Sequence, residues 1–209
     1  YIGEKITITQ HSLQVAEHAR LSGESEEIQL ACFLHDIGHL LGFEANIELG
    51  MEGCGIENHE QIGATFLKNI GLSNIIYEIV ANHVNAKRYL CSKSEEYYNK
   101  LSDASKITLK YQGGLMSRAE LIEFEKNSLF QIFLRCRKYD EMGKDHINLL
   151  DENDNKYYNL LNKYNLKNSY ILSEYQKNHY DKVGYIIIKN GLKYLGINEE
   201  ILYKIIKNI

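Results

Sequence analysis

The stretch LACFLHDIGHLLG, residues 30–42, places an adjacent histidine and aspartate, His35 and Asp36, inside an almost wholly apolar segment. It belongs to a longer run, residues 25–42, in which Ser25 can cap a helix and a glycine can end it. A helix that is apolar nearly all round is buried at the centre of a domain. The sequence therefore predicts one central helix over residues 25–42 that carries an ionisable pair into the core.

Helical patterns flank this segment on both sides. We expect helices from Thr7 or Thr9 to about residue 22, and over residues 58–70, 73–90, 102–112 and 117–144, with a glycine-containing loop over residues 42–56. Alternating strand patterns are nearly missing. The predicted fold class is therefore all-α.

Composition fits one globular domain with an ordinary core. Of 209 residues, 44% are hydrophobic and 25% are charged. We expect a catalytic core over residues 1–150 and a helical C-terminal extension over residues 151–209, packed on the core. The net charge of -4 gives no electrostatic reason for a polyanionic partner, so no nucleic acid is expected.

The cysteines, at positions 32, 54, 91 and 136, form no Cys-x-x-Cys pair, as expected of a reduced intracellular protein. No run approaches the roughly 18 apolar residues of a membrane span, and the amino end shows no signal-peptide pattern. We expect a cytoplasmic protein without a membrane partner. The sequence starts at Tyr1 rather than methionine, so further residues are expected before it.

The buried pair needs a partner, because burying His35 and Asp36 alone would cost several kcal/mol. A metal ion satisfies both side chains, and the second carboxylate oxygen stays free to bridge a second ion. For the dipeptide alone, hydrogen bonds to other helices are an equally good explanation.

Further histidines favour a metal ion over hydrogen bonds to other helices. His11, His59 and His83 each lie in a separate predicted helix, flanked by apolar residues at helical spacing. One such histidine is usually a satisfied core residue, but three of them around a buried pair indicate ligands that converge in a helical bundle. Asp140, near the end of the predicted helix 117–144, supplies a further carboxylate. The candidate metal ligands are His11, His35, Asp36, His59, His83 and Asp140.

The order of these ligands resembles that of HD-domain proteins, in particular the two-metal form with two extra histidines between the His-Asp pair and the last aspartate. Within that form, the segments NHEQIGATFL, NHVNAKRYLC, LSDASKITLKYQGG and LRCRKYDEMGK are similar to dioxygenases that degrade 2-amino-1-hydroxyethylphosphonate. The similarity runs from Tyr1 to about Lys144. It includes residues that are not ligands, which a general HD phosphohydrolase would have no reason to share.

The resemblance implies an HD-domain helical bundle with a mixed-valence Fe(II)/Fe(III) site and O2 as co-substrate, related to that of inositol oxygenase. It implies one iron on His11, His35, Asp36 and Asp140, and a second on His59 and His83, with Asp36 bridging. Mixed imidazole and carboxylate ligands also suit manganese or zinc, so ligand type alone does not decide the metal.

A polar pocket is expected beside the metals. Lys87 lies one turn after His83 on the same predicted helix face, where an ammonium can bind an anion, and the resemblance implies that the anion is a phosphonate. Ser105, Thr108 and Gln112 follow the spacing i, i+3, i+7 and share one stripe. Exposed helix surface is the alternative for all four residues.

Three further residues are expected at the site. His39, one turn after the His-Asp pair, can bond substrate oxygens or a carboxylate behind the metal ligands. Tyr1 and Glu4 match a Tyr-x-x-Glu of the phosphonate enzymes, which implies that Glu4 pairs with the substrate ammonium and that Tyr1 caps an iron before substrate arrives. Arg88, next to Lys87, is expected on the surface.

The function predicted from this resemblance is an iron-dependent dioxygenase that oxidatively cleaves the carbon-phosphorus bond of a 1-hydroxyphosphonate, converting 2-amino-1-hydroxyethylphosphonate to glycine and phosphate. One alternative is a metal-dependent phosphohydrolase acting on a phosphomonoester or nucleotide, which needs no oxygen. A second is a binding module without turnover, which has little need for two redox-capable metals. The sequence does not separate a primary amine from its trimethylated relative, and it leaves the oligomeric state open.

Overall fold

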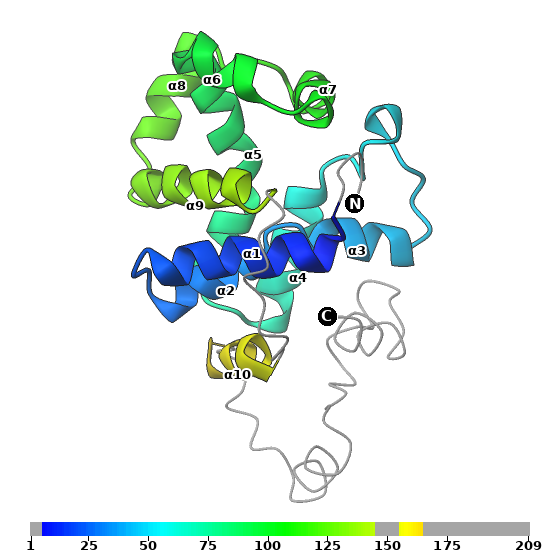
Figure 1. The fold of residues 1–209 in the computed structure, drawn as a ribbon, viewed down its shortest axis with the longest axis vertical. Coiled ribbons are helices and arrows are strands. Elements are labelled where there is room, and N and C mark those ends of the chain that lie inside the picture. The colour runs from blue at the N-terminus through cyan, green and yellow to red at the C-terminus, as the bar shows by residue number, and fades with distance from the viewer. Residues whose placement is uncertain (1–5, 145–154, 165–209) are drawn as a thin grey trace, which may run out of the picture.

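The structure, a computed structural model, describes residues 6–144 and 155–164, and these residues are helical with short connections (Figure 1). The elements are α1 (Ile8–Leu21), α2 (Glu26–Leu34), α3 (Ile37–Glu44), a 3-10 turn η1 (Met51–Gly53), α4 (His59–Ile70), α5 (Asn74–Lys93), α6 (Glu95–Lys100), α7 (Asp103–Tyr111), α8 (Arg118–Glu125), α9 (Phe130–Met142) and α10 (Asn155–Tyr164). The described residues contain no β-strand, and an isolated β-bridge joins Gly50 and Gly55. The all-α prediction is confirmed.

Most helices begin where their capping residues predict. The Thr7 side chain accepts a bond from the third residue of α1, and that residue's side chain bonds back to the Thr7 backbone. Ser117 caps α8 in the same reciprocal way, while the Ser25 and Ser102 side chains each accept a bond from the third residue of α2 and α7. At the other end, Gly71 closes α4 with a left-handed backbone, φ 92°.

The single helix predicted over residues 25–42 is wrong. The chain forms two helices, α2 and α3, which meet at the His-Asp pair: Asp36 has φ -100° and ψ 9°, outside the helical range. Both helices are buried around the break, so the apolar pattern runs across it without interruption. The turn lets α3 pack closely on α4, where a methyl group on Gly38 would lie 1.8 Å from the His59 carbonyl oxygen.

The predicted helix 117–144 is also two helices, α8 and α9. Between them the Asn127 side chain accepts a bond from the Leu129 backbone (2.8 Å) and turns the chain, although no glycine or proline marks the position. The short helix α6 lies between the predicted helices 73–90 and 102–112, where no helix was predicted, and Ser94 caps it.

The core lies between α1, α2, α4, α5 and α9, and every residue of α2 from Ile28 to Leu34 is buried. At one end of the bundle α6, α7 and α8 gather around the end of α5 (Figure 1). Helix α7 lies outside the main core, and its residues Ser105 and Thr108 line a cavity together with Asp36 and His83 from the bundle. No helix in the described parts of the chain has both the length and the apolar composition for crossing a bilayer.

On the opposite side α10 packs against α2 (Figure 1). The rings of Tyr157 and Phe33 stack with centroids 4.6 Å apart, and Lys156 donates to Gln29 (3.0 Å). The larger prediction, a helical extension over residues 151–209 that packs on the core, extends beyond the described residues and stays a prediction.

Candidate metal centre

All six predicted ligand side chains are buried and converge at one place in the bundle. His11 comes from α1, His35 and Asp36 from the junction of α2 and α3, His59 from the start of α4, His83 from α5 and Asp140 from α9. None is more than 6% exposed. Elements far apart in the sequence therefore bring these side chains together, as the helical spacing predicts.

One set of donor atoms, the first group, forms around one carboxylate oxygen of Asp36. Asp36 Oδ2 lies 3.3 Å from His35 Nε2 and 3.9 Å from His11 Nε2. Asp140 Oδ1 lies 3.2 Å from His11 Nε2 and 3.9 Å from His35 Nε2. Two imidazoles and two carboxylates thus face one point.

The second group forms around the other oxygen of Asp36. Asp36 Oδ1 lies 3.6 Å from His59 Nε2 and 3.7 Å from His83 Nε2. The two Nε2 atoms are 3.0 Å from each other. Asp36 therefore presents one oxygen to each group, which is the arrangement of a bridging carboxylate.

Backbone carbonyls orient all four imidazoles in the same sense. Nδ1 lies near the carbonyl oxygen of Gly143 for His11 (3.2 Å), of Cys32 for His35 (2.7 Å), of Ile56 for His59 (3.2 Å) and of Val80 for His83 (2.7 Å). A carbonyl oxygen only accepts, so each Nδ1 carries a hydrogen, and Nε2 is the ring atom that faces Asp36 and can bind a metal.

This arrangement fits metal ions. Two Nε2 lone pairs that face each other at 3.0 Å, as in His59 and His83, repel unless a cation lies between them. Ligand atoms bound about 2.1 Å from one ion at right angles lie about 3 Å apart, close to the shortest distances in each group. Histidine and aspartate donors suit first-row transition metals. The residues present therefore fit two ions that share Asp36.

The electrostatics favour the ligand forms of His59, His83 and Asp36 but not that of His35. Burial lowers the pKa of His35, but the charges of Asp36 and Asp140 outweigh it and raise this pKa to about 9, so a metal ion would have to displace a proton from this ring. Burial lowers the pKa of His83 to about 4, and burial together with the neighbouring His39 and His83 holds the pKa of His59 well below its usual range. Both rings are therefore neutral at pH 7. Burial opposes the ionisation of Asp36, but the charge and hydrogen bond of His35 outweigh it and hold the Asp36 pKa well below its ordinary value.

Arg137 holds Asp140 in position. This buried guanidinium donates to Asp140 Oδ2, which leaves Oδ1 for the first group, and it also bonds Glu141 (3.1 Å) and the Tyr97 hydroxyl (3.0 Å). Burial opposes the charge on Asp140, but the neighbouring Arg137 charge outweighs it and lowers the carboxyl pKa well below its usual range. The sequence did not lead us to predict Arg137 as a site residue, although its i, i+3 spacing from Asp140 is typical of an ion pair on one helix face.

Comparison with known proteins shows which family the chain belongs to. The family model described as HD domain matches residues 8–110. The chain is 45% identical over 144 residues to an uncharacterised protein of Acanthamoeba polyphaga mimivirus. It is 42% identical over 147 residues to the [1-hydroxy-2-(trimethylamino)ethyl]phosphonate dioxygenase (glycine-betaine-forming) of Leisingera caerulea, and 37% identical over 144 residues to the hydroxymethylphosphonate dioxygenase of Gimesia maris.

The chain belongs to the HD-domain oxygenase family. Each alignment covers 69% of this chain. The aligned parts span 65% of the viral relative and 72% and 71% of the two dioxygenases. The HD-domain match over residues 8–110 includes His11, His35, Asp36, His59 and His83, whereas Asp140 lies beyond it.

A cavity of about 70 Å³ opens beside the two groups. One wall is formed by Asp36, His59 and His83. The facing wall carries all four residues of the predicted pocket: Lys87, Ser105, Thr108 and Gln112. The alternative of exposed helix surface does not hold for Lys87 and Ser105, which are buried.

Lys87 is the most unusual residue of this wall. It is 4% exposed, and its Nζ donates to Thr108 Oγ1 (2.9 Å). Among the described residues it forms no ion pair with a carboxylate, and burial lowers its pKa to about 7. A buried ammonium that faces a cavity and bonds a neutral hydroxyl is suited to an incoming anion.

His39 also lines the cavity. Its ring stacks on that of His59 with centroids 3.8 Å apart, and its Nδ1 accepts a bond from the Ile56 backbone (3.1 Å). Since Nδ1 accepts, the neutral ring carries its hydrogen on Nε2. Of the two roles that the sequence left open, this tautomer suits donation to a molecule in the cavity.

Other predictions differ in outcome. Arg88 is not a surface residue: it is half-buried, and it bonds the carbonyls of Gly113 and Gly114 and the carboxylate of Glu120. Tyr1 and Glu4 lie outside the described residues, so their roles stay predictions. Sequence reasoning also missed a second lysine at the cavity, Lys144.

Proposed function

We propose that this chain is an iron-dependent dioxygenase that cleaves the carbon-phosphorus bond of a 1-hydroxyphosphonate. One observation carries the proposal: Asp36 presents one oxygen to each of two histidine groups, and the cavity beside them has a buried lysine, Lys87, in its facing wall. The first group would hold one iron and the second group the other, in the Fe(II)/Fe(III) state. The irons, when bound, supply the activation of dioxygen.

The proposed substrate is 2-amino-1-hydroxyethylphosphonate. With one molecule of dioxygen it gives one glycine and one phosphate, so the C1–H and C–P bonds break and the carbon is oxidised as dioxygen is reduced. One oxygen atom of dioxygen enters the carboxylate and the other enters the phosphate. No further reductant is needed.

The chain's own residues bind and orient the substrate. Lys87 would bind the phosphonate together with the hydroxyls of Ser105 and Thr108, and this would direct the hydroxyl-bearing carbon towards Asp36. The buried Oε1 of Gln112 accepts no hydrogen bond within the described residues, so it can accept one from a substrate donor. His39 can donate to a substrate oxygen from Nε2.

The size of the cavity supports a small substrate. A volume of about 70 Å³ holds only a few water-sized groups, since one water occupies roughly 10–15 Å³ on the same scale. A hydroxyphosphonate has few heavy atoms, whereas a nucleotide would extend far outside. This observation disfavours the nucleotide form of the hydrolase alternative.

Recognition of the substrate amine belongs to a different part of the chain. Among the described residues, the carboxylates that line the cavity are Asp36 and Asp140, and both face the histidines. We therefore keep the proposal that Glu4 pairs with the ammonium group and that Tyr1 caps an iron before substrate binds. The trimethylated substrate of the Leisingera caerulea enzyme is the comparison that tests the amine preference.

The decisive experiment incubates iron-loaded protein with 2-amino-1-hydroxyethylphosphonate, with and without dioxygen. Phosphate, glycine and oxygen consumption should move together, and aerobically purified protein should contain close to two irons per chain and show a mixed-valence signal in electron paramagnetic resonance. Oxygen-independent phosphate release from a phosphomonoester, or full activity with magnesium after iron removal, would overturn the proposal.

The variant Lys87→Ala tests the anion site within the same assay. It should greatly weaken use of the substrate while iron is retained, because a hydrogen bond to a charged group contributes about 1.5–3 kcal/mol. Lys110→Ala is the matched control, since Lys110 is an exposed lysine on α7. Loss of iron in Lys87→Ala would contradict its assignment to the substrate.

A further inference from the structure

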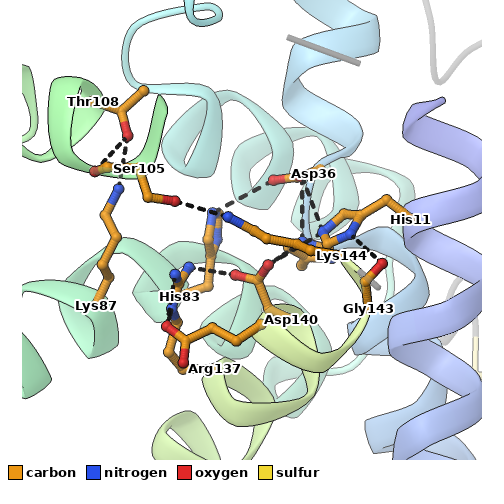
Figure 2. A network of polar contacts seen from close by, with 12 residues as sticks. His11, Asp36, His83, Lys87, Ser105, Thr108, Arg137, Asp140, Gly143 and Lys144 are labelled. Carbon is orange, nitrogen blue, oxygen red and sulfur yellow. Dashed lines mark hydrogen bonds and ion pairs between the residues drawn. The ribbon is translucent and has the colours of Figure 1, made fainter. Parts of the chain in front are cut away.

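Lys144 reaches the cavity from the end of α9. Its Nζ donates to Ser105 Oγ on α7 (2.8 Å), across a sequence separation of 39 residues. Figure 2 shows the side chain extending past Asp140 towards Ser105. The side chain is half-buried and lines the cavity.

Two ammonium groups therefore meet neighbouring hydroxyls from two different helices. Ser105 and Thr108 lie one turn apart on α7; Lys144 bonds the first and Lys87, from α5, bonds the second (Figure 2). We propose that Lys144 is a second phosphonate-binding cation and that, with Lys87, it makes the site selective for a doubly charged head group. This inference rests on the proposed function and deepens it.

The charges around the cavity support this assignment. Lys87 and Lys144 both direct their ammonium groups to hydroxyls of α7, and both line the cavity. The two lining carboxylates belong to the first and second groups. Two ammonium groups, those of Lys87 and Lys144, therefore lie against the wall formed by α7. The two negative charges of a phosphonate dianion would pair with both ammonium groups, whereas a monoanion carries only one charge.

The backbone before Lys144 is fixed against the first group. The Gly143 carbonyl accepts from His11 Nδ1, and a methyl group on Gly143 would lie 2.5 Å from Val15 Cγ2, so the end of α9 is pressed onto α1. Lys144 therefore starts from a fixed point beside a metal ligand and ends at Ser105. A head group held by both lysines would lie at the α7 wall.

The test compares two anions of similar shape and different charge. Iron-loaded protein is titrated without dioxygen with methylphosphonate, at a pH where it is a dianion, and with methanesulfonate, a monoanion, by isothermal titration calorimetry. The variants are Lys144→Met, which keeps most of the stem, Lys144→Gln as a second neutral replacement, and Lys144→Arg, which restores the charge. Lys138→Met, an exposed lysine on α9, is the control.

We expect Lys144→Met and Lys144→Gln to weaken methylphosphonate binding about tenfold or more, the lower end for a hydrogen bond to a charged group. Methanesulfonate binding should change much less, Lys144→Arg should recover most of the affinity, and iron content should stay at the wild-type value. Unchanged methylphosphonate binding, equal weakening of both anions, or loss of iron would each overturn the inference.

Turnover separates this inference from the proposed function. In turnover of a hydroxyphosphonate, Lys144→Met should raise KM more than it lowers kcat. If the dianion preference depends on Lys144 but the wild type consumes no oxygen with any hydroxyphosphonate, the inference stands and the proposed function fails. If the wild type turns over and Lys144→Met keeps its KM, the inference fails alone.

Discussion

Replacing Arg137 with leucine removes the charge that holds Asp140. The guanidinium is 4% exposed and bonds Asp140, Glu141 and the Tyr97 hydroxyl. Leucine fills part of the space but leaves the Asp140 carboxylate, itself 5% exposed, without its strongest partner. The cost of Arg137→Leu is therefore that of a buried charge separated from its counterion.

Breaking a buried ion pair costs about 3–5 kcal/mol. For a chain of this size, each kcal/mol corresponds to about 2–4 °C in Tm, so the expected decrease is about 6–20 °C. Arg135→Leu is the matched control, because Arg135 lies two residues away on α9, is 46% exposed and pairs with Glu24. An exposed pair contributes about 0–1 kcal/mol, so its Tm should fall by at most about 4 °C.

Thermal unfolding of the metal-free proteins at pH 7, followed by circular dichroism, measures both decreases. The pH dependence of the Tm difference between wild type and Arg137→Leu is a second measurement. The pKa of Asp140 is depressed in the folded protein, so its stabilising effect is present above about pH 4, the unfolded value, and is lost as the pH falls through the folded value. The gap between wild type and Arg137→Leu should therefore narrow in acid. Equal Tm decreases for the two arginine variants would refute the reasoning.

Three further predictions concern the second group and its support. His59→Ala and His83→Ala should each empty one metal position and leave the other partly filled; full occupancy of both, measured by atomic absorption, would contradict the two-group assignment. The pKa of His83 is about 4 in the folded protein and roughly 6.5 when unfolded, so metal-free protein should lose stability as the pH falls from about 6.5 to 4. Urea midpoints should show a smaller decrease over this range for His83→Phe. Gly38→Ala should lower both Tm and iron content, because its methyl group would lie 1.8 Å from the His59 carbonyl oxygen; wild-type values would show that α3 can move away from α4 at little cost.

The convergence of His11, His35, Asp36, His59 and His83 could be predicted because each is a polar residue in an apolar helical pattern, whereas Asp140 was added because of the others. His59 and His83 are buried beside apolar neighbours, and the sequence shows those neighbours directly. Burying such residues is costly unless they share a partner, so their convergence followed from energetics as much as from the family resemblance.

The interruptions in the helices could not be predicted in the same way. The break at Asp36 lies between two segments that are both buried, so hydrophobicity is continuous across it. The turn at Asn127 depends on one side-chain bond, for which the composition gives no warning. Both are decided by tertiary packing rather than by local propensity.

Arg137 and Lys144 were missed for another reason. Both lie in the polar segment RCRKYDEMGK, where basic residues usually point to solvent at the end of a helix. Only the tertiary structure brings the end of α9 close enough to α7 for Lys144 to bond Ser105. A contact between residues so far apart in the sequence leaves no mark on local periodicity.

Three of the imidazoles that face Asp36 take their orientation from a carbonyl three residues earlier in the chain, at Cys32, Ile56 and Val80. His11 is different, because its carbonyl belongs to Gly143. All donor atoms of the second group therefore come from residues before the end of α5, whereas the first group also needs Asp140 and the Gly143 carbonyl at the end of α9. A change that displaces the end of α9 would thus act directly on the first group and only indirectly on the second.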